Sequence, residues 1–373
     1  MGTANFTDKT IWTGDNLDIL RGMNSECVDL IYLDPPFNSN QNYAAPVGSK
    51  AAGAAFKDTW TLSDLDVAWM GLIADEQPAV AHLLRTAGLT HGKGMQSYLT
   101  MMAVRLIEMN RVLKPPGSIY VHCDPTASHY LKMLMDAIYG QRNFRNEITW
   151  KRRHGFSSAV HKSVRFGVCT DILLFYAKSE DTKFYPQYNT NSSEYQTYVE
   201  NHFTQVDEHG RRYQANNLAN PNYRPNLIYE YKGYPPPENG WTITREKMEQ
   251  WDKEGRIHFP KNQDGRLRRK SFSDELKGMP LQNLWDDIQM VSPHSKEGTG
   301  YPTQKPLVLL ERIIKASSNE GDVVLDPFCG CATACVAADK LGRKWVGIDI
   351  SPKAVELVNI RLQETMGSLF HNR

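Results

Sequence analysis

Hydrophobic residues fall into two patterns along this chain: short, nearly continuous runs, and residues spaced three or four positions apart. The short runs at residues 28–33, interrupted only by Asp29, and 323–325 predict strands of a parallel sheet, because helices cover both faces of such strands. Spacings of three and four predict a helix with one apolar face, through Met95, Tyr98, Leu99, Met102, Leu106, Met109 and Leu113. Further strands are predicted at residues 118–122, 144–150, 170–176 and 344–349, and further helices at residues 126–139, 307–318, 333–341 and 351–366. The pattern therefore predicts one α/β sheet built from both ends of the chain.

The regular spacing breaks down between residues 179 and 296, where tyrosine, asparagine and proline are frequent. A stretch of this length without periodicity predicts a loop-rich insert or a small irregular domain. We expect three segments: residues 1–178 and 297–373 as the two halves of the α/β domain, and residues 179–296 as the insert. Residues 39–57 predict a second loop, mostly alanine and glycine between positions 44 and 55, which we expect to be mobile and to act as a lid.

Composition narrows the class of protein. Hydrophobic residues make up 40% of the chain, charged residues 23%, and the formal net charge is +1, which is ordinary for a globular protein. No apolar run is long enough to span a membrane and the first ten residues lack a signal pattern, so we expect a cytoplasmic protein. Cys329, Cys331 and Cys335 cluster, but no second pair at zinc spacing accompanies them, and we expect no metal.

A carboxylate follows the first apolar run, in the phrase Asp34-Pro35-Pro36-Phe37. The carboxyl ends of parallel strands line the crevice where ligands bind, so Asp34 is predicted to face a ligand. Two prolines stiffen the turn and remove two backbone donors, which leaves acceptors suited to a planar NH2 group. The Phe37 ring offers a face on which a planar base could stack. The alternative is a loop that only ends the strand, with Phe37 in the core.

A second carboxylate, Asp326, follows the other apolar run and leads through Phe328 into a turn at Gly330. A strand that ends in an acid, a tight glycine turn and a helix from Thr333 bring the backbone close to a nucleotide-like ligand. Asp349 ends the next strand, about twenty residues later, where nucleoside-binding units place the acceptor for ribose hydroxyls. A plain strand–turn–helix connection looks similar, so this feature alone leaves both interpretations open.

Together these phrases resemble the amino-group DNA methyltransferases, which use S-adenosylmethionine to methylate the exocyclic nitrogen of adenine or cytosine. Residues 34–37 match the family's Asp-Pro-Pro-Phe signature, and residues 326–333 match its cofactor motif except at Cys331 and Ala332, where the family has serine and glycine. Residues 13–15 and 301–306 resemble two further elements of the family. A catalytic motif that precedes the cofactor motif, with an insert between them, is the order of the permuted beta class. The resemblance implies a Rossmann-like, circularly permuted methyltransferase sheet with a loop-rich DNA-recognition insert.

The resemblance also implies which residues bind and react. The implied catalytic residues are Asp34, Pro35, Pro36 and Phe37, and the implied cofactor-binding residues are Asp15, Thr303, Gln304, Lys305, Pro306, Asp326, Phe328, Gly330, Thr333, Asp349 and Ser351. A leading aspartate with phenylalanine favours N6 of adenine, reached by flipping the base out of the duplex. N4 of cytosine is the alternative within the family. The alternatives in other classes are an RNA or protein methyltransferase and a catalytically inactive DNA-binding scaffold.

Two basic runs lie in the middle third of the chain: Lys151, Arg152 and Arg153, and Arg266, Arg268, Arg269 and Lys270. Runs of this kind bind phosphates in nucleic-acid-binding proteins, although most are solvated faces. With the irregular composition of residues 179–296, they predict contacts to double-stranded DNA. A cognate restriction endonuclease and a second copy of the chain are further partners that the resemblance allows.

Overall fold

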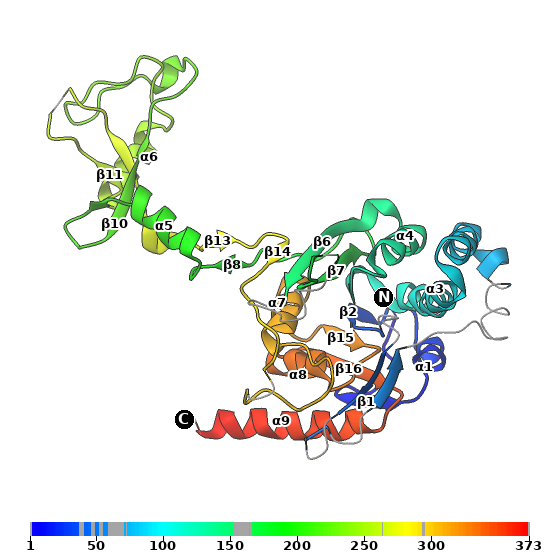
Figure 1. The fold of residues 1–373 in the computed structure, drawn as a ribbon. Coiled ribbons are helices and arrows are strands. Elements are labelled where there is room, and N and C mark those ends of the chain that lie inside the picture. Colours follow the sequence, from blue (N-terminus) through cyan, green and yellow to red (C-terminus); the bar gives the residue numbers. More distant parts are fainter. Residues whose placement is uncertain are drawn as a thin grey trace. The chain divides into compact units, whose positions relative to one another are not determined.

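The computed structural model describes residues 2–36, 41–45, 49–51, 55–58, 71, 73–152, 164, 166–262, 264–292 and 295–371. The chain divides into two compact units, coloured along the sequence in Figure 1. The sheet unit comprises Met1–Pro186 and Gln282–Arg373, and the insert unit comprises Gln187–Leu281. Both ends of the chain therefore build one unit, and the insert unit begins and ends within the middle segment expected at residues 179–296.

An eight-stranded sheet forms the centre of the sheet unit, in the order β1-β16-β15-β2-β5-β7-β6-β14. The strands are β1 (Thr10–Thr13), β16 (Lys344–Asp349), β15 (Val323–Asp326), β2 (Val28–Leu33), β5 (Leu113–Cys123), β7 (Thr170–Ala177), β6 (Phe144–Lys151) and β14 (Leu284–Trp285). Neighbouring strands are parallel, except that β7 is antiparallel to both β5 and β6. The prediction of one α/β sheet built from both ends of the chain is confirmed, because β15 pairs with β2.

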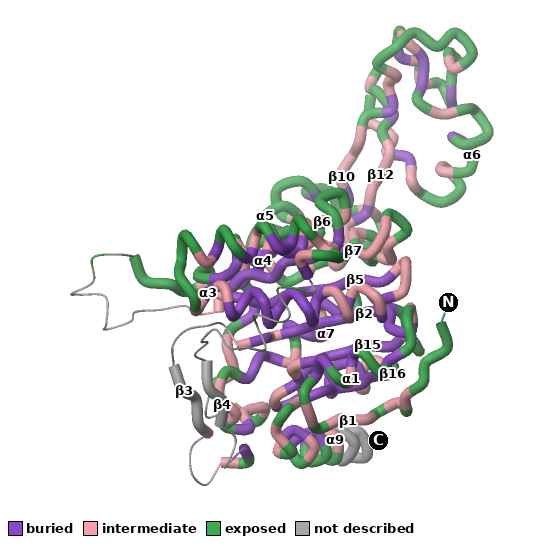
Figure 2. The backbone as a smooth tube through the Cα atoms, turned by 90° about the vertical axis from the view of Figure 1, so that its right-hand side faces the viewer, coloured by how far each residue is buried: buried purple, intermediate pink, exposed green. Residues whose placement is uncertain are grey.

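Helices cover both faces of this sheet (Figure 1). On one face lie α1 (Asn16–Gly22), α3 (Pro78–Val112) and α4 (Ser128–Tyr139), and on the other lie α7 (Leu307–Ser317), α8 (Thr333–Lys340) and α9 (Lys353–His371). Figure 2 shows β2, β5, β15 and β16 buried between these layers. α3 begins well before the predicted apolar face and is kinked at Gly92, whose φ is +83°. Within the described part of the chain, no helix is long and apolar enough to cross a membrane.

The segment predicted as a mobile loop, residues 39–57, includes paired strands. β3 (Gln41–Ala44) is antiparallel to β4 (Ala55–Asp58). Ala51 is fully buried beside Cys331 and Leu357, and its N–H donates to the Thr299 carbonyl at 3.1 Å. A small side chain permits this close backbone approach, which low apolar content in the sequence does not reveal. Apart from residues 45, 49 and 50, the rest of the segment lies outside the described residues, and the lid stays a prediction.

The insert unit is built around its own small core rather than from loops alone. A four-stranded antiparallel sheet runs in the order β11 (Ile257–His258), β12 (Arg268–Phe272), β10 (Arg212–Asn217), β9 (Gln205–Val206). Its other elements are the pair β8 (Tyr188–Asn189) and β13 (Met279–Pro280), the helices α5 (Ser193–His202) and α6 (Arg245–Lys253), and the short 3-10 turns at Pro225–Leu227 and Ser273–Glu275. The core contains Leu218, Tyr231, Trp241, Met248, Ile257 and Leu267. These residues follow no helix or strand period in the sequence, so periodicity does not identify them as a core.

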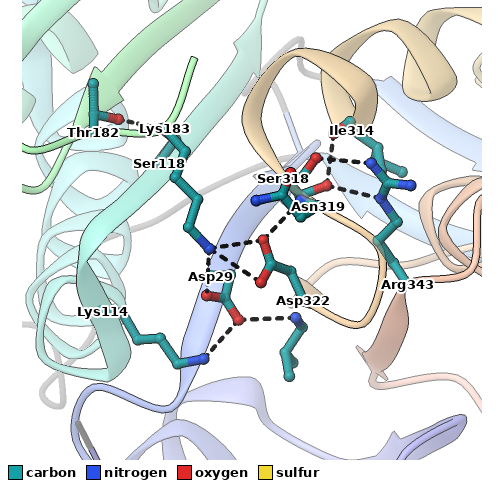
Figure 3. A network of polar contacts seen from close by, with 11 residues as sticks. Asp29, Lys114, Ser118, Thr182, Lys183, Ile314, Ser318, Asn319, Asp322 and Arg343 are labelled. Carbon is teal, nitrogen blue, oxygen red and sulfur yellow. Dashed lines mark hydrogen bonds and ion pairs between the residues drawn. The ribbon is translucent and has the colours of Figure 1, made fainter. Parts of the chain in front are cut away.

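A buried carboxylate joins the two halves of the sheet unit at the amino ends of β2 and β15 (Figure 3). Asp29 is 4% exposed and accepts hydrogen bonds from the Lys114 ammonium at 2.7 Å and from the Val323 N–H at 2.9 Å. The Lys183 ammonium lies 3.5 Å from Asp29 and 2.9 Å from Asp322. Segments as far as 294 positions apart in the sequence therefore meet around one charge.

Replacement of Asp29 by alanine should lower the free energy of unfolding by about 3–5 kcal/mol, because it leaves partly buried cations without their partner. Lys340→Ala is the matched control: it removes an exposed partner of Glu311 and should cost less than about 1 kcal/mol. Urea unfolding followed by circular dichroism measures both losses. Equal losses in the two variants would contradict the structural role assigned to Asp29.

Candidate active site

A cavity of about 500 Å³ lies at the carboxyl edge of the central parallel strands. β2, β15 and β16 all end at this cavity, where their carboxylates form part of its lining. The sequence-predicted site residues that line it are Asp15, Asp34, Pro35, Pro36, Thr303, Gln304, Lys305, Asp326, Phe328, Gly330, Thr333, Asp349 and Ser351. Pro306 is not among the lining residues; it is buried at the N-cap of α7. Phe37 lies outside the described residues.

The turn that follows β15 brings the backbone to the cavity wall. Asp326 is 3% exposed, and burial raises the pKa of its carboxyl well above the usual range, although the Phe328 N–H donates to it at 3.2 Å. Gly330 has a φ of +52°, and a Cβ at this position would lie 3.0 Å from the Tyr301 ring. Only glycine meets both constraints without strain. The glycine turn predicted from the sequence is therefore required by this geometry.

Asp349 closes the same turn from the next strand. Its carboxylate accepts hydrogen bonds from the Gly330 N–H and the Ser351 N–H, each at 2.8 Å. Burial raises the pKa of Asp349, and these two hydrogen bonds oppose that rise. Ile350, the next residue, lines the cavity although it is 78% exposed. Its position beside a strand-end acid makes it an apolar surface for a flat ligand, a feature that the sequence analysis missed.

The two residues that depart from the family's cofactor motif keep the turn intact. Ala332 has a φ of +57°, in the left-handed region, where the family's glycine would be unstrained and an alanine costs about 1–2 kcal/mol. The buried guanidinium of Arg361, in α9, donates to the Cys331 carbonyl at 2.7 Å and to the Thr333 hydroxyl at 2.9 Å. These bonds hold the turn in the conformation that Ala332 alone disfavours.

A buried arginine that the sequence analysis missed joins three parts of the cavity wall. Arg105, in α3, is 7% exposed and lies 2.7 Å from the Asp15 carboxylate. It also donates to the Asn16 side chain at 2.5 Å, and Asn16 donates to the Pro327 carbonyl at 2.7 Å. Asp15 accepts from the Leu17 N–H at 2.8 Å and so caps α1. The predicted cofactor residue Asp15 is therefore held by α1 and Arg105.

At the cavity wall, Asp34 forms an ion pair with Lys305, a residue predicted to bind the cofactor. The Lys305 ammonium lies 2.6 Å from Asp34 Oδ2, and the two side chains are 9% and 19% exposed. Asp34 Oδ1 is also buried, and within the described part of the chain it has no hydrogen-bond partner. The structure therefore presents a carboxylate with one oxygen held by a cation and one oxygen uncommitted.

The loop that carries Lys305 is held in an unusual backbone conformation. Thr303 has a φ of +64°, which is an outlier for a β-branched residue. Gln304 is 8% exposed, accepts from the Thr299 N–H at 2.9 Å and donates to the Glu297 carbonyl at 2.9 Å. Backbone strain of this kind is found at functional sites when surrounding contacts hold it in place. Gln304 supplies those contacts here.

The predicted DNA-contacting residues divide into two groups. Arg266 and Arg268 are exposed, whereas Arg269 lies over the Trp251 ring at 4.5 Å and Lys270 over the Tyr213 ring at 5.2 Å. All four belong to the insert unit. In the other run, Arg152 lies 3.2 Å from the Asp171 carboxylate, Lys151 ends β6, and Arg153 lies outside the described residues.

Residues 28–360 match the N6/N4 DNA methylase family. The type II methyltransferase M.EcaI of Enterobacter cloacae is 30% identical over 93% of this chain and 68% of its own length. The Mod subunit of the type III restriction-modification enzyme StyLTI, from Salmonella typhimurium, is 26% identical over 89% of this chain and 50% of its own length. The DNA adenine methyltransferase YhdJ of Escherichia coli K12 is 24% identical over 94% of this chain and 81% of its own length. The chain thus spans between half and about four fifths of the length of these relatives.

Asp349→Ala should weaken binding of S-adenosylmethionine at least tenfold, because a hydrogen bond to a charged acceptor is worth about 1.5–3 kcal/mol. Glu356→Ala, an exposed acidic position in the following helix, is the matched control and should leave the affinity unchanged. Isothermal titration calorimetry measures both dissociation constants. An unchanged affinity in Asp349→Ala would mean that the ribose hydroxyls bind elsewhere.

Proposed function

The chain belongs to the N6/N4 DNA methylase family, and we propose that it methylates the exocyclic N6 of adenine in double-stranded DNA. As an amino-group DNA methyltransferase, it uses S-adenosylmethionine as the methyl donor. The target base, the role of each site residue and the surface that binds DNA are parts of the proposal.

One observation carries the proposal: the buried Asp34 Oδ1 has no partner among the described residues, in a cavity whose wall also contains Asp326 and Asp349. An unsatisfied buried acceptor costs about 1–3 kcal/mol, and a donor from a ligand removes that cost. Lys305 holds the other oxygen at 2.6 Å and so fixes the orientation of the carboxylate. Asp34 is therefore arranged to accept one hydrogen bond from an NH2 group beside the cofactor.

The cavity has the size and chemistry that S-adenosylmethionine needs. Its volume of about 500 Å³ is within the range of small-molecule sites. Asp349 would accept hydrogen bonds from the ribose hydroxyls, and the exposed Ile350 would contact the flat adenine ring of the cofactor. The carboxyl groups of Asp326 and Asp34 also line the cavity. When bound, the cofactor supplies an electrophilic methyl group.

Asp34 and Pro35 would make the target amine more reactive. The lone pair of the adenine amine is delocalised into the ring, so the nitrogen is a poor nucleophile. Hydrogen bonds from its two N–H groups to the Asp34 carboxylate and the Pro35 carbonyl would favour a pyramidal nitrogen with a directed lone pair. The nitrogen would then attack the methyl group in line, so that the N–C bond forms as the S–C bond breaks and a neutral thioether leaves. Correct positioning of the reactants is worth about 7–11 kcal/mol in well-oriented systems, and the methylated amine releases its proton afterwards.

The base must leave the duplex before this geometry can form, at a cost of a few kcal/mol. Stacking on an aromatic ring returns about 1–3 kcal/mol, and Phe37 is the residue proposed for that contact. We assign DNA recognition to the insert unit, because Arg266 and Arg268 are exposed there. A cognate restriction endonuclease is included among the proposed partners, since one relative is a subunit of a restriction-modification enzyme.

Adenine is favoured over cytosine by the aspartate that leads residues 34–37 and by the substrate named for the relative YhdJ. Cytosine N4 is the alternative, because the family includes both activities. DNA from cells that express the protein can be digested to nucleosides and analysed by mass spectrometry. N6-methyldeoxyadenosine supports the proposal, and N4-methyldeoxycytidine in its place selects the alternative.

Asp34→Ala should reduce methyl transfer by about 10²-fold or more while cofactor affinity changes little, because Asp34 acts on the target amine. Asp18→Ala, an exposed acidic position in α1, is the matched control. Transfer of a radiolabelled methyl group to unmethylated genomic DNA gives the rates, and calorimetry gives the affinities. Turnover in Asp34→Ala at the level of the control would remove the basis of the catalytic assignment.

The double variant Arg266→Ala/Arg268→Ala should bind all DNA sequences more weakly, with a salt slope smaller by about 1 for each phosphate that the variant no longer binds. Arg269→Ala/Lys270→Ala is the matched control, because these side chains already lie over aromatic rings and should change the slope less. Fluorescence anisotropy of a labelled duplex, measured over a range of salt concentrations, gives the slopes. If neither pair changes the slope, this cluster is a solvated face.

A further inference from the structure

Three buried polar side chains lead from the cavity wall into the sheet. Tyr32, His122 and Asp171 are 2%, 0% and 2% exposed. The Tyr32 hydroxyl lies 2.9 Å from His122 Nδ1, and His122 Nε2 lies 3.2 Å from Asp171 Oδ2. Tyr32 belongs to the cavity lining, whereas the other two lie behind it. His122 and Asp171 have no role in the cofactor or catalytic assignments made above.

The strand register places these side chains on the same face of the sheet. Tyr32 of β2 is opposite Tyr120 of β5, and His122, two residues later, is opposite Leu173 of β7. Because strand side chains alternate between faces, Tyr32, His122 and Asp171 all point to the face covered by α7 and α8. Asp34 follows Tyr32 by two positions, and both line the cavity. Among the nearby charges, the Asp34 carboxylate has the largest effect on the pKa of the Tyr32 hydroxyl, which it raises in addition to the effect of burial.

The protonation of Asp171 and Tyr32 gives these hydrogen bonds a direction. Burial alone would raise the pKa of Asp171, but the hydrogen bond and the charge of His122, together with the charges of Lys305 and Arg152, outweigh it and lower that pKa. An ionised Asp171 accepts from His122 Nε2–H, and in the tautomer with its proton on Nε2 the imidazole has its lone pair on Nδ1. Burial raises the pKa of Tyr32, so its hydroxyl keeps its proton and donates to Nδ1 of that tautomer.

Packing alone does not explain this choice of residues. Tyr120, on the same face and also 2% exposed, satisfies its hydroxyl with one neutral partner, the Ser317 hydroxyl at 2.7 Å. Tyr32 instead uses a histidine that is held by a buried carboxylate. Burial of a carboxylate is costly unless charges and hydrogen bonds compensate it. A neutral hydrogen-bond partner, such as a serine hydroxyl, would be sufficient if the Tyr32 hydroxyl needed only to be satisfied in the core.

We propose that His122 is a positioning residue which, held by Asp171, keeps the Tyr32 hydroxyl turned away from Asp34 Oδ1. The inference rests on the proposed function, in which Asp34 Oδ1 accepts the hydrogen bond from the target amine. That oxygen has no partner among the described residues, and a buried hydroxyl that loses its acceptor moves toward another one. Without His122, the Tyr32 hydroxyl would compete with the target amine for Asp34.

His122→Gln separates the two contacts of His122. The glutamine amide can still donate to Asp171, but it offers Tyr32 no acceptor at the position of Nδ1. We expect kcat for methyl transfer to fall at least tenfold, while the KM for S-adenosylmethionine changes less than twofold. Tyr32→Phe removes the competing hydroxyl, so the double variant Tyr32→Phe/His122→Gln should recover most of the lost kcat.

Transfer of a tritiated methyl group to unmethylated genomic DNA measures both constants, and thermal unfolding verifies that each variant is folded. Tyr120→Phe is the matched control: it removes an equally buried hydroxyl from the neighbouring strand on the same face and should leave kcat unchanged.

A double variant as slow as His122→Gln overturns the inference, and so does an unchanged kcat in His122→Gln. If His122→Gln does not fold, Asp171→Asn and its double variant with Tyr32→Phe provide the same comparison. No transfer by the unmodified protein would contradict the proposed function instead.

Discussion

The ion pair between Lys305 and Asp34 decides what the cavity can do. Asp34, Asp326 and Asp349 lie at the ends of three neighbouring strands, and the charges of Asp34 and Asp349 add to the effect of burial in raising the pKa of Asp326. Lys305 places its ammonium 2.6 Å from Asp34, and its charge also opposes the effect of burial on the pKa of Asp326. One cation therefore supports a carboxylate at the centre of this edge and leaves one of its oxygens uncommitted.

Aspartates at the two edges of the sheet differ in how fully their charges are compensated. Asp29 and Asp34 both belong to the β2 region, five positions apart in the sequence. At the amino edge, Asp29 is surrounded by two ammonium groups and a backbone N–H, which fix β2 against β15. At the carboxyl edge, Asp34 has a cation on one oxygen only. A rigid, fully compensated edge holds the positions of the residues at the incomplete edge, as an ordered binding site requires.

Sequence patterns predict the features that depend on local chemistry. The apolar runs at residues 28–33 and 323–325 became β2 and β15, because strands covered on both faces must be apolar, and their strand-end acids meet at one cavity. The contact of Lys305 with Asp34 was not predictable, since it joins positions 271 apart through the path of a loop. Arg105 was hidden in the apolar face of a predicted helix. The residues of the insert core around Trp241 follow no helix or strand period, so only the irregular composition of this segment is evident in the sequence.

Three departures from ordinary geometry lie at the cavity, while others, such as the positive φ of Lys9, Glu26 and Lys232, lie elsewhere in the fold. Ala332 and Thr303 have positive φ, and Asp34 keeps an unsatisfied oxygen within the described part of the chain. Each such feature costs about 1–3 kcal/mol. Arg361 and Gln304 hold the two strained turns by hydrogen bonds, so the strain persists without a ligand. The unsatisfied oxygen differs, because only a donor from outside can complete it. In the proposed function, the target amine is that donor and replaces solvent at this oxygen.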